Sequence, residues 1–566
     1  MRRGLFLHHS SLALALACGM ACAGMAQAQD AAPVQQGQEV ERRLRREMDS
    51  AQDAVEQNSR VLKGAATRRH AAFAAPAETA CTVATDVDWN DIRPFPWLPG
   101  TVSLRGMCLG PKGLQELRRY LGGQLIERGY VTSMVLIPEQ RPADGRIAIQ
   151  VIPGRVGKLI DKTTGQPLQA RNALPFRQGD LLNLRDLDQA LENLRRVPGQ
   201  SKANLTLTPG SDIGTSDIVV DRQRSKERWH AVLTADNDGQ DATGQNQLGL
   251  IGIVDAPLGR DDLLLLTQSN NLNVGNRRQM SRGLGLNWSM PVGYWNVSLG
   301  ASGSSSRQTV DLLQGGQIAY ANKTRLVQLG VDRVVARSSR SRSTVKLQLN
   351  RRIDSGKLGS TRLDVQRRDI TGYAVSYDYL RYLGRTTLQA SAELRGGLPE
   401  WSARPGYVAG QPHWNGRYRL ASASLNINAP FAIGGKRFTY EGTLSGQHAF
   451  TPLPWTQYLS ISSRYAMRGF DGRYVFIGEN GWVSHNDVVW NSGSKLGNPY
   501  LGADAARLSG PSLANGGSQH FSSVSLGLRG QVARFGYDLS AGRVLSKPKA
   551  WSDGGFNVSL RMTVRL

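Results

Sequence analysis

The last residues of the chain, Gly554–Leu566 with the sequence GGFNVSLRMTVRL, alternate strictly between apolar and polar side chains. The apolar positions are Phe556, Val558, Leu560, Met562, Val564 and Leu566, and two of the polar residues between them are arginines. A period of two indicates a β-strand with one apolar and one polar face. In a soluble sandwich these faces would meet a protein core and bulk water, whereas in a membrane barrel they would meet lipid and a wet lumen. The rest of the chain decides between the two.

The same alternation dominates the C-terminal half of the chain, from about Trp229 onwards. It recurs in TVKLQLN, TLQASAELR and SVSLGLRG, and stretches rich in Gly, Ser, Asn and Asp separate these segments. A transmembrane strand takes about 9 to 11 residues, and about 20 with its turn or loop. The half therefore has room for roughly 16 antiparallel strands.

The N-terminus has the features of a secretory signal peptide. Arg2 and Arg3 precede an apolar stretch, and Ala26-Gln27-Ala28 forms an A-x-A cleavage site. The apolar stretch is short for a retained anchor, which is the alternative. No later stretch approaches 18 consecutive apolar residues, so we expect an exported protein without a transmembrane helix. A closed barrel is the other structure that spans a membrane, and it would place the Val/Leu/Met face of the last strand in lipid and its Arg face in the lumen.

The charge of the chain bears on which classes of partner it can bind. The chain has 69 Lys and Arg against 45 Asp and Glu, a formal net charge of +24. These cations are scattered rather than gathered into a long tail, so an Arg-lined lumen explains them better than nucleic-acid binding. Few histidines, no metal-ligand cluster and no nucleophile motif argue against an enzyme, a metal or a cofactor. His485 and Asp487 in VSHNDVVW fit lumen or loop polarity better than catalysis.

The mature chain keeps two cysteines, Cys81 and Cys108. In an oxidising compartment they are most simply a disulfide, which closes a loop of roughly 28 residues and stabilises by about 3 kcal/mol in the loop-entropy treatment. A two-cysteine metal site without a nearby histidine is the weaker alternative.

A charged segment from Gln35 to about Leu62 has a thin apolar line at helical spacing. The stripe consists of Val40, Leu44, Met48, Ala51 and Val55. A helix with one narrow apolar face is either a surface helix or weak coiled coil, or a mostly polar helix inside a water-filled cavity. An Ala-rich linker follows.

Two consecutive modules with the order helix, strand, strand precede the alternating half. The first has a helix with Leu114, Leu117, Leu121 and Leu125 on one face, ended by Gly129, and the second has Leu184, Leu187, Leu191 and Leu194. A repeat of this plan at about 70 to 75 residues indicates two small α+β domains.

Several stretches resemble the outer-membrane transporters of two-partner secretion, the TpsB family of haemolysin and filamentous-adhesin exporters (ShlB/FhaC/HecB type). LIERGYVTSMVLIPEQ is similar to the first polypeptide-transport-associated (POTRA) module of that family, and LNLRDLDQALENLRRVPGQSKANLTLTPGSDIGTSDIVV to the second. DNDGQDATGQNQLGL, DAPLGRDDLL, YAMRGFDG, PYLGADAARLSG and SLGLRGQVARFGYDLSAGRVLSKPKAW are similar to barrel segments. The resemblance covers essentially the whole mature chain.

The resemblance implies an all-β transmembrane barrel preceded by two POTRA domains and an N-terminal plug helix. The expected domains are a signal peptide (1–28), the plug helix (29–62), a linker (63–80), the first POTRA domain (81–154), the second (155–225) and the barrel (226–566). The barrel would lie in the outer membrane with the POTRA domains in the periplasm.

The resemblance also implies a transport motif, Met467-Arg468-Gly469-Phe470, on a long loop that folds back into the barrel. Its arginine is expected to pair with Asp504 on the lumen wall, with Asp538 as the other candidate. Two positions depart from the family pattern: Met467 stands where valine is usual, and Ala506 where glycine is usual.

The implied activity is translocation of one large secreted protein, recognised by the POTRA domains, through a barrel that is expected to be monomeric and in contact with outer-membrane lipid. The family uses no nucleotide, which agrees with the absence of a G-x-x-x-x-G-K-[ST] sequence. Haemolysin, adhesin and contact-dependent toxin are all possible clients. The alternative is a barrel-assembly insertase, although such a protein usually carries more POTRA modules than this chain has room for.

Overall fold

The structure is a computed structural model. It describes residues 32–61, 72–138, 145–169, 171–273, 275–276, 278–312, 315–408, 410–461, 466–513, 517–548 and 555–566. The expected signal peptide and the first part of the expected linker lie outside these residues.

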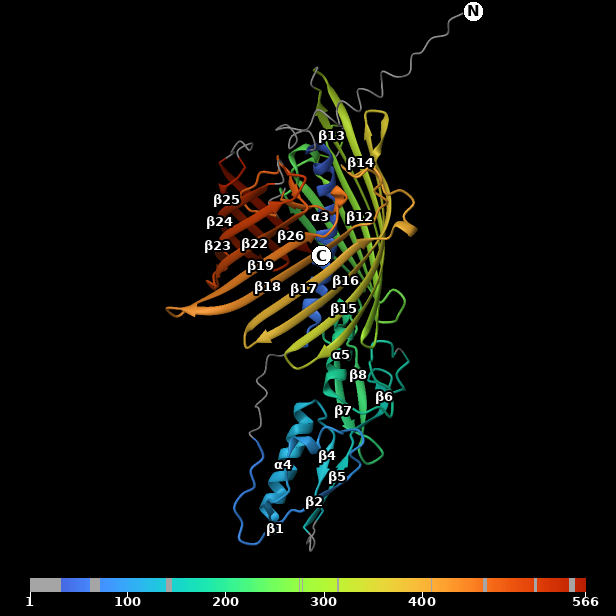
Figure 1. Ribbon diagram of the computed structural model, residues 1–566, viewed down its shortest axis with the longest axis vertical. Coiled ribbons are helices and arrows are strands. Elements are labelled where there is room, and N and C mark those ends of the chain that lie inside the picture. Colours follow the sequence, from blue (N-terminus) through green and yellow to red (C-terminus); the bar gives the residue numbers. More distant parts are fainter. Residues whose placement is uncertain are drawn as a thin grey trace, which may run out of the picture.

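Two small sheets with one helix each lie below a large barrel, and α3 (Ala32–Ser59) runs through the barrel interior (Figure 1). The first module contains β1 (Thr82–Val83), β2 (Asp86–Asn90), β3 (Cys108–Leu109), α4 (Pro111–Glu127), β4 (Met134–Leu136) and β5 (Arg146–Ile152). The second contains β6 (Arg155–Asp161), α5 (Leu184–Arg195), β7 (Asn204–Pro209) and β8 (Thr215–Asp221). None of the helices in the described part of the chain is long and apolar enough to cross a membrane.

Each module buries the leucine face of its helix against a three-stranded sheet. In the first, Leu117, Leu121 and Leu125 are fully buried with the alternating isoleucines and valine of β5, in a sheet of order β2-β5-β4. In the second, α5 packs on a sheet of order β6-β8-β7. A disulfide joins Cys81 to Cys108 at the edge of the first module.

The barrel closes with 16 antiparallel strands, as the alternation predicted. Its strands are β9 (Trp229–Asp236), β10 (Gln247–Asp255), β11 (Leu263–Asn271), β12 (Met280–Val292), β13 (Trp295–Asp311), β14 (Gln317–Arg337), β15 (Ser341–Leu358), β16 (Thr361–Leu383), β17 (Thr386–Gly397), β18 (Arg419–Ile433), β19 (Lys436–Ala449), β22 (Asn480–Trp490), β23 (Asn498–Ser509), β24 (Ser518–Val532), β25 (Phe535–Ser546) and β26 (Phe556–Arg565). Two short strands, β20 (Leu459–Ile461) and β21 (Phe476–Gly478), pair with each other outside this order.

The last strand has the two faces that its sequence predicted. β26 pairs with β9 and so closes the barrel. Phe556 and Val558 are exposed on the outer wall, whereas Ser559 Oγ donates to Asp238 Oδ1 on the lumen side. The apolar face therefore faces outwards and the polar face faces the lumen.

The second module is docked on the turns at one end of the barrel. Gly293, in the turn between β12 and β13, donates its N–H to Asn172 O (2.7 Å) and accepts from Asn193 Nδ2 (2.7 Å). Arg196, just after α5, donates to Ser289 O and to Asn296 Oδ1 (2.9 Å each). This contact marks the end of the barrel that the resemblance predicts to be periplasmic, and it orients the lumen relative to the modules.

Candidate functional site in the barrel lumen

Helix α3 places its apolar stripe against the lumen wall of β10–β13. Leu44 packs over Gly283, where an added Cβ would lie 3.1 Å from a Leu44 methyl carbon. Met48 packs over Gly285, where an added Cβ would collide with the Met48 sulfur. The missing side chains of the two glycines form the groove that the stripe occupies.

The rest of the stripe continues along the same wall. Ala51 and Val55 form a buried cluster with Leu263 and Leu265 of β11. Val40 is also buried and lies near the opposite end of the helix, beside a small pocket. All five residues of the predicted stripe therefore lie on the helix face that meets the wall.

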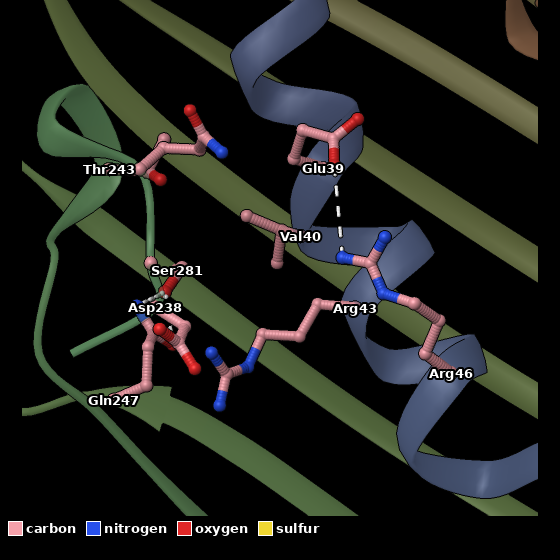
Figure 2. A pocket seen from close by; sticks show the side chains of 10 residues that line it. Glu39, Val40, Arg43, Arg46, Asp238, Thr243, Gln247 and Ser281 are labelled. Atoms are coloured by element: carbon pink, nitrogen blue, oxygen red, sulfur yellow. Dashed lines mark hydrogen bonds and ion pairs between the residues drawn. The ribbon is translucent and has the colours of Figure 1, made fainter. Parts of the chain in front are cut away.

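The polar side of α3 is held by charged residues of the barrel. Arg43 donates to both oxygens of Asp236 on β9 (2.9 and 2.6 Å) and to Glu47 Oε1 (2.9 Å). Glu41 pairs with Arg352 of β15 (3.1 Å) on the other side of the lumen. Figure 2 shows Arg43 directed at the loop that carries Asp238, with Glu39 and Arg46 paired along the helix (3.8 Å).

The long connection between β19 and β22, called here the Arg468 loop (residues 450–479), also binds α3. Ser460 Oγ donates to Glu39 Oε1 (2.8 Å). Gln36 Nε2 donates to the carbonyl of Arg473 (2.9 Å). Helix and loop therefore occupy the lumen together and contact each other.

Arg468 lies against the lumen face of two neighbouring strands, β22 and β23, and binds two carboxylates. Its Nε and its backbone N–H donate to Asp504 Oδ2 (2.9 Å each), and its terminal nitrogens bind Asp504 Oδ1 and Asp487 Oδ1. Asp504 is almost fully buried, with 1% of its side chain exposed. His485, opposite Asp504 in the ladder of β22 and β23, places Nδ1 3.3 Å from the same carboxylate.

Asp487 is the partner that sequence reasoning missed. It is held from its other side by Arg529 (2.6 Å), which also binds Glu441 (2.9 Å). Asp538 instead accepts a hydrogen bond from Tyr500 Oη (2.8 Å) and, among the described ion pairs, is not a partner of Arg468. Asp487 lies in VSHNDVVW, whose polar residues the sequence suggested to be lumen or loop residues. No sequence signal linked Asp487 to Arg468.

The other three residues of the motif fix the loop in place. Met467 and Phe470 are buried in an apolar cluster on the lumen side of β22–β25 that includes Ala506 and Phe521. Gly469 has φ +93°, and an added Cβ would lie 3.0 Å from the Arg543 backbone. Glycine therefore permits both the backbone conformation and the close approach.

A second group of residues joins α3 to the second module. Glu192 of α5, buried at 3% exposure, binds both terminal nitrogens of Arg337 (2.7 Å each) and Arg342 (3.1 Å) at the periplasmic turn between β14 and β15. Glu192 Oε1 also accepts the N–H of Val61, just after α3 (3.0 Å). One carboxylate thus contacts the module, the barrel and the end of the lumen helix.

The charged residues of the lumen pair with one another. The residues that the structure describes contain no group of three or more His, Cys, Asp or Glu side chains that could hold a metal ion. The chemistry of the lumen is that of ion pairs and hydrogen bonds between parts that fill it.

Comparisons with known proteins agree with this arrangement. Residues 214–530, more than half of the chain, match the family described as haemolysin secretion/activation protein ShlB/FhaC/HecB. Residues 92–154 match the ShlB-type POTRA domain, and residues 152–209 match a POTRA domain.

Individual relatives cover most of the chain. Outer membrane transporter CdiB-2 of Burkholderia pseudomallei (strain 1026b) is 29% identical over 465 residues, 81% of this chain and 79% of that protein. Hemolysin transporter protein ShlB of Serratia marcescens is 27% identical over 446 residues, 78% of each chain. The solved structure of CdiB from Acinetobacter baumannii has the same fold, with a TM-score of 0.81 at 22% identity over 93% of this chain and 98% of that one. The chain belongs to the ShlB/FhaC/HecB haemolysin secretion/activation family and is an outer-membrane transporter of two-partner secretion, with its POTRA domains in the periplasm.

Proposed function

We propose that the protein exports one large secreted partner by docking the unfolded chain on its POTRA domains and threading it through a lumen from which α3 has moved. The observation that carries this proposal is the occupancy of the lumen. Helix α3 and the Arg468 loop both lie in it and hold each other, and the proposal is that an extended client needs one or both to be displaced. Folding of the client outside the cell would then give the movement its direction, without a nucleotide.

The contacts of α3 suit a removable plug. Its side chains are mostly polar or charged, and its ion pairs with Asp236 and Arg352 can be exchanged for hydrogen bonds to water. The net contribution of such pairs is small because desolvation offsets their attraction. The Arg468–Asp504 pair is proposed to hold the loop in the position from which it supports the resting plug.

A cysteine pair tests whether α3 must move. A Cβ built on Gly37 lies 3.4 Å from Cβ of Asn322 on β14, near the lower end of the range for disulfides. The Gly37→Cys/Asn322→Cys variant should form a cross-link in the oxidising periplasm. We expect cross-linked protein to insert normally, to lose secretion of the client and to recover it after mild reduction.

Each single-cysteine variant is the matched control, because reduction also opens the Cys81–Cys108 disulfide. These variants should secrete before and after reduction. Full secretion by cross-linked protein would contradict the plug proposal. Loss of outer-membrane proteins in general, rather than of one client, in cells without the protein would favour an insertase.

The POTRA sheet nearest the barrel offers an edge for the client. In the order β6-β8-β7, β7 is paired on one side only, so an extended segment can add to its other side. We expect hydrogen-exchange protection of Asn204–Pro209 when the N-terminal region of the client binds the full-length protein. Protection of other residues, with none on β7, would indicate that the client docks at another site.

The protein is proposed to act as a monomer. Closure of the barrel through β26 and β9 leaves no unpaired edge in the membrane sheet for a second copy. Light scattering of the purified protein in detergent should give the mass of one chain, and a dimer that persists on dilution would contradict this.

A further inference from the structure

The outer wall of the barrel carries a group of cations on strands β12–β15. Contacts with α3 establish which residues face inwards. Gly283 lies under Leu44, and Ser306 Oγ donates to Gly37 O. Because successive strand residues point to opposite faces, Arg282 of β12 and Arg307 of β13 face outwards, and both are exposed.

The same reasoning orients the next two strands. Thr324 of β14 donates to Asp354 (2.7 Å) and Arg352 of β15 pairs with Glu41, so both face the lumen. Their neighbours Lys323, Arg325 and Arg351 therefore face outwards and are exposed. These five outward cations, Arg282, Arg307, Lys323, Arg325 and Arg351, are called here the outer basic patch.

On β12 and β14 the patch begins where the lipid-facing apolar residues end, whereas on β15 Arg351 lies one outward position before the exposed Ile353. On β12, Arg282 follows the exposed Leu286 and Leu284 towards the extracellular end, and on β14 Arg325 follows Val327. From the periplasmic end of β14 at Arg337, Arg325 is about 40 Å along the strand at roughly 3.3 Å per residue, or about 30 Å in height at a tilt of about 40°. The apolar band of such barrels is about 25 Å tall, so the patch lies at the level of the outer-leaflet headgroups.

The ladder places the five cations side by side. Ser305 of β13 pairs with both Arg282 and Lys323, which puts these two cations in one row, two strands apart. Arg307 is diagonal to both, since it pairs with Met280 and Ala321.

Arg325 and Arg351 extend the group onto β15. Arg325 pairs with Ile353 and Val327 with Arg351, so the two cations are also diagonal neighbours. Diagonal neighbours are about 7–8 Å apart, and the patch spans about 14 Å across four strands.

Little negative charge opposes this group. Arg351 pairs with Asp369 (2.8 Å) on the same outer wall. Arg282, Arg307, Lys323 and Arg325 have no ion-pair partner among the residues that the structure describes. Like charges at such spacing repel each other, and an anion bound between them would relieve that repulsion.

We propose that the outer basic patch binds the phosphorylated headgroup of an outer-leaflet glycolipid, with its acyl chains lying along the exposed leucines and valines of β12–β15. The site needs both features, because the cations take the phosphates and the apolar wall below them takes the chains. Its width allows contact with more than one phosphate. The lipid would thereby hold the long strands β13–β16 at a fixed depth.

Native mass spectrometry of the full-length protein in neutral detergent tests the proposal with diphosphoryl lipid A as the probe. The Lys323→Gln/Arg325→Gln variant should bind at least about tenfold more weakly than the unaltered protein. Monophosphoryl lipid A should bind more weakly than the diphosphoryl form, and added salt should weaken both, because the patch is exposed.

Arg333→Gln/Arg381→Gln is the matched control. It removes two exposed, outward-facing cations from β14 and β16 at the periplasmic end of the same wall. The control should bind lipid A like the unaltered protein. Heat-dependent migration on gels checks that each barrel is folded, and the single variant Arg282→Gln replaces the double variant if the latter does not fold.

Three results would overturn the proposal. One is equal binding by the patch variant and the unaltered protein. Another is an equal loss in the control, which would indicate a general effect of charge. The third is equally tight binding of phosphatidylglycerol, which would indicate attraction of any anionic lipid rather than a site for a phosphorylated glycolipid.

Discussion

Replacing Arg468 with alanine removes the cation that Asp504 and Asp487 share, and the two carboxylates should respond differently. Asp504, with 1% of its side chain exposed, loses its hydrogen bonds to the guanidinium and keeps the Arg468 backbone N–H and His485. Removing one partner of a buried pair costs about 3–5 kcal/mol, and the retained donors favour the lower end. Asp487 is more exposed and keeps Arg529, so its share is about 1 kcal/mol or less.

The expected total of about 3–4 kcal/mol shifts the closed loop toward open states by two orders of magnitude or more. Hydrogen exchange of residues 466–478 in the purified protein should therefore accelerate by roughly that factor. Secretion of the client should fall while the amount of folded barrel stays constant. The same measurements on Asp487→Asn should show a change of tenfold or less.

Arg473→Ala is the matched control, since Arg473 lies on the same loop with 59% of its side chain exposed. It should leave both exchange and secretion nearly unchanged. The reasoning would be refuted by an unchanged exchange rate in Arg468→Ala, or by equal effects of Asp504→Asn and Asp487→Asn.

Three further outcomes are expected. Gly469→Ala should destabilise the closed Arg468 loop by about 1–3 kcal/mol, because φ is +93° and the new Cβ meets backbone. Gly434→Ala, in the turn between β18 and β19, has φ +56° and open space around the new Cβ, so it isolates the conformational part. Amide exchange of the residues around each glycine measures the two effects. Glu192→Gln should leave Arg337 without its carboxylate and Arg342 with Glu56 alone, and should raise the protease sensitivity at the end of α3 (residues 58–61); unaltered cleavage there would contradict the link. Although desolvation raises it, hydrogen bonds from the first N–H groups of α4 bring the pKa of Glu78 below its usual value. The carboxylate therefore stabilises the first POTRA domain above the unfolded pKa of about 4.3, and this contribution is lost as pH falls through the lower folded value. Amide exchange at the start of α4 should accelerate on acidification, and Glu78→Gln should remove that dependence.

The sequence predicts those parts of the fold in which apolar side chains repeat with a regular local period. Alternation in β26 and similar segments indicates which residues face lipid, and helical spacing indicates the leucine faces of α4 and α5. The stripe on α3 was equally visible, but its docking position was not. Gly283 and Gly285 form the groove that receives it. A glycine in a strand carries no sequence pattern that indicates which side chain will pack against it.

Pairings across the lumen required the structure because they join residues far apart in sequence. Arg43 and Asp236 belong to different elements separated by both POTRA domains, and each is one of many charged residues with the right orientation. The resemblance offered Asp504 for Arg468 but not Asp487. Asp487 and Asp504 come within reach of one guanidinium because β22 and β23 are neighbours whose inward side chains converge on the folded-back loop.

The balance of contacts on α3 bears on what must displace it. Burial of Val40, Leu44 and Val55 contributes about 1.5–3 kcal/mol for each side chain, an upper estimate. The ion pairs add little net free energy, because water replaces them when the helix leaves. A helix held by about 5–8 kcal/mol is outside the lumen in well under one molecule in a thousand at rest. A ligand shifts such an equilibrium only by its difference in affinity for the two states. The client must therefore bind the open state more tightly than the closed state by a similar free energy. Because Glu192 joins the second POTRA domain to the end of α3, a client that docks on this domain binds next to the plug.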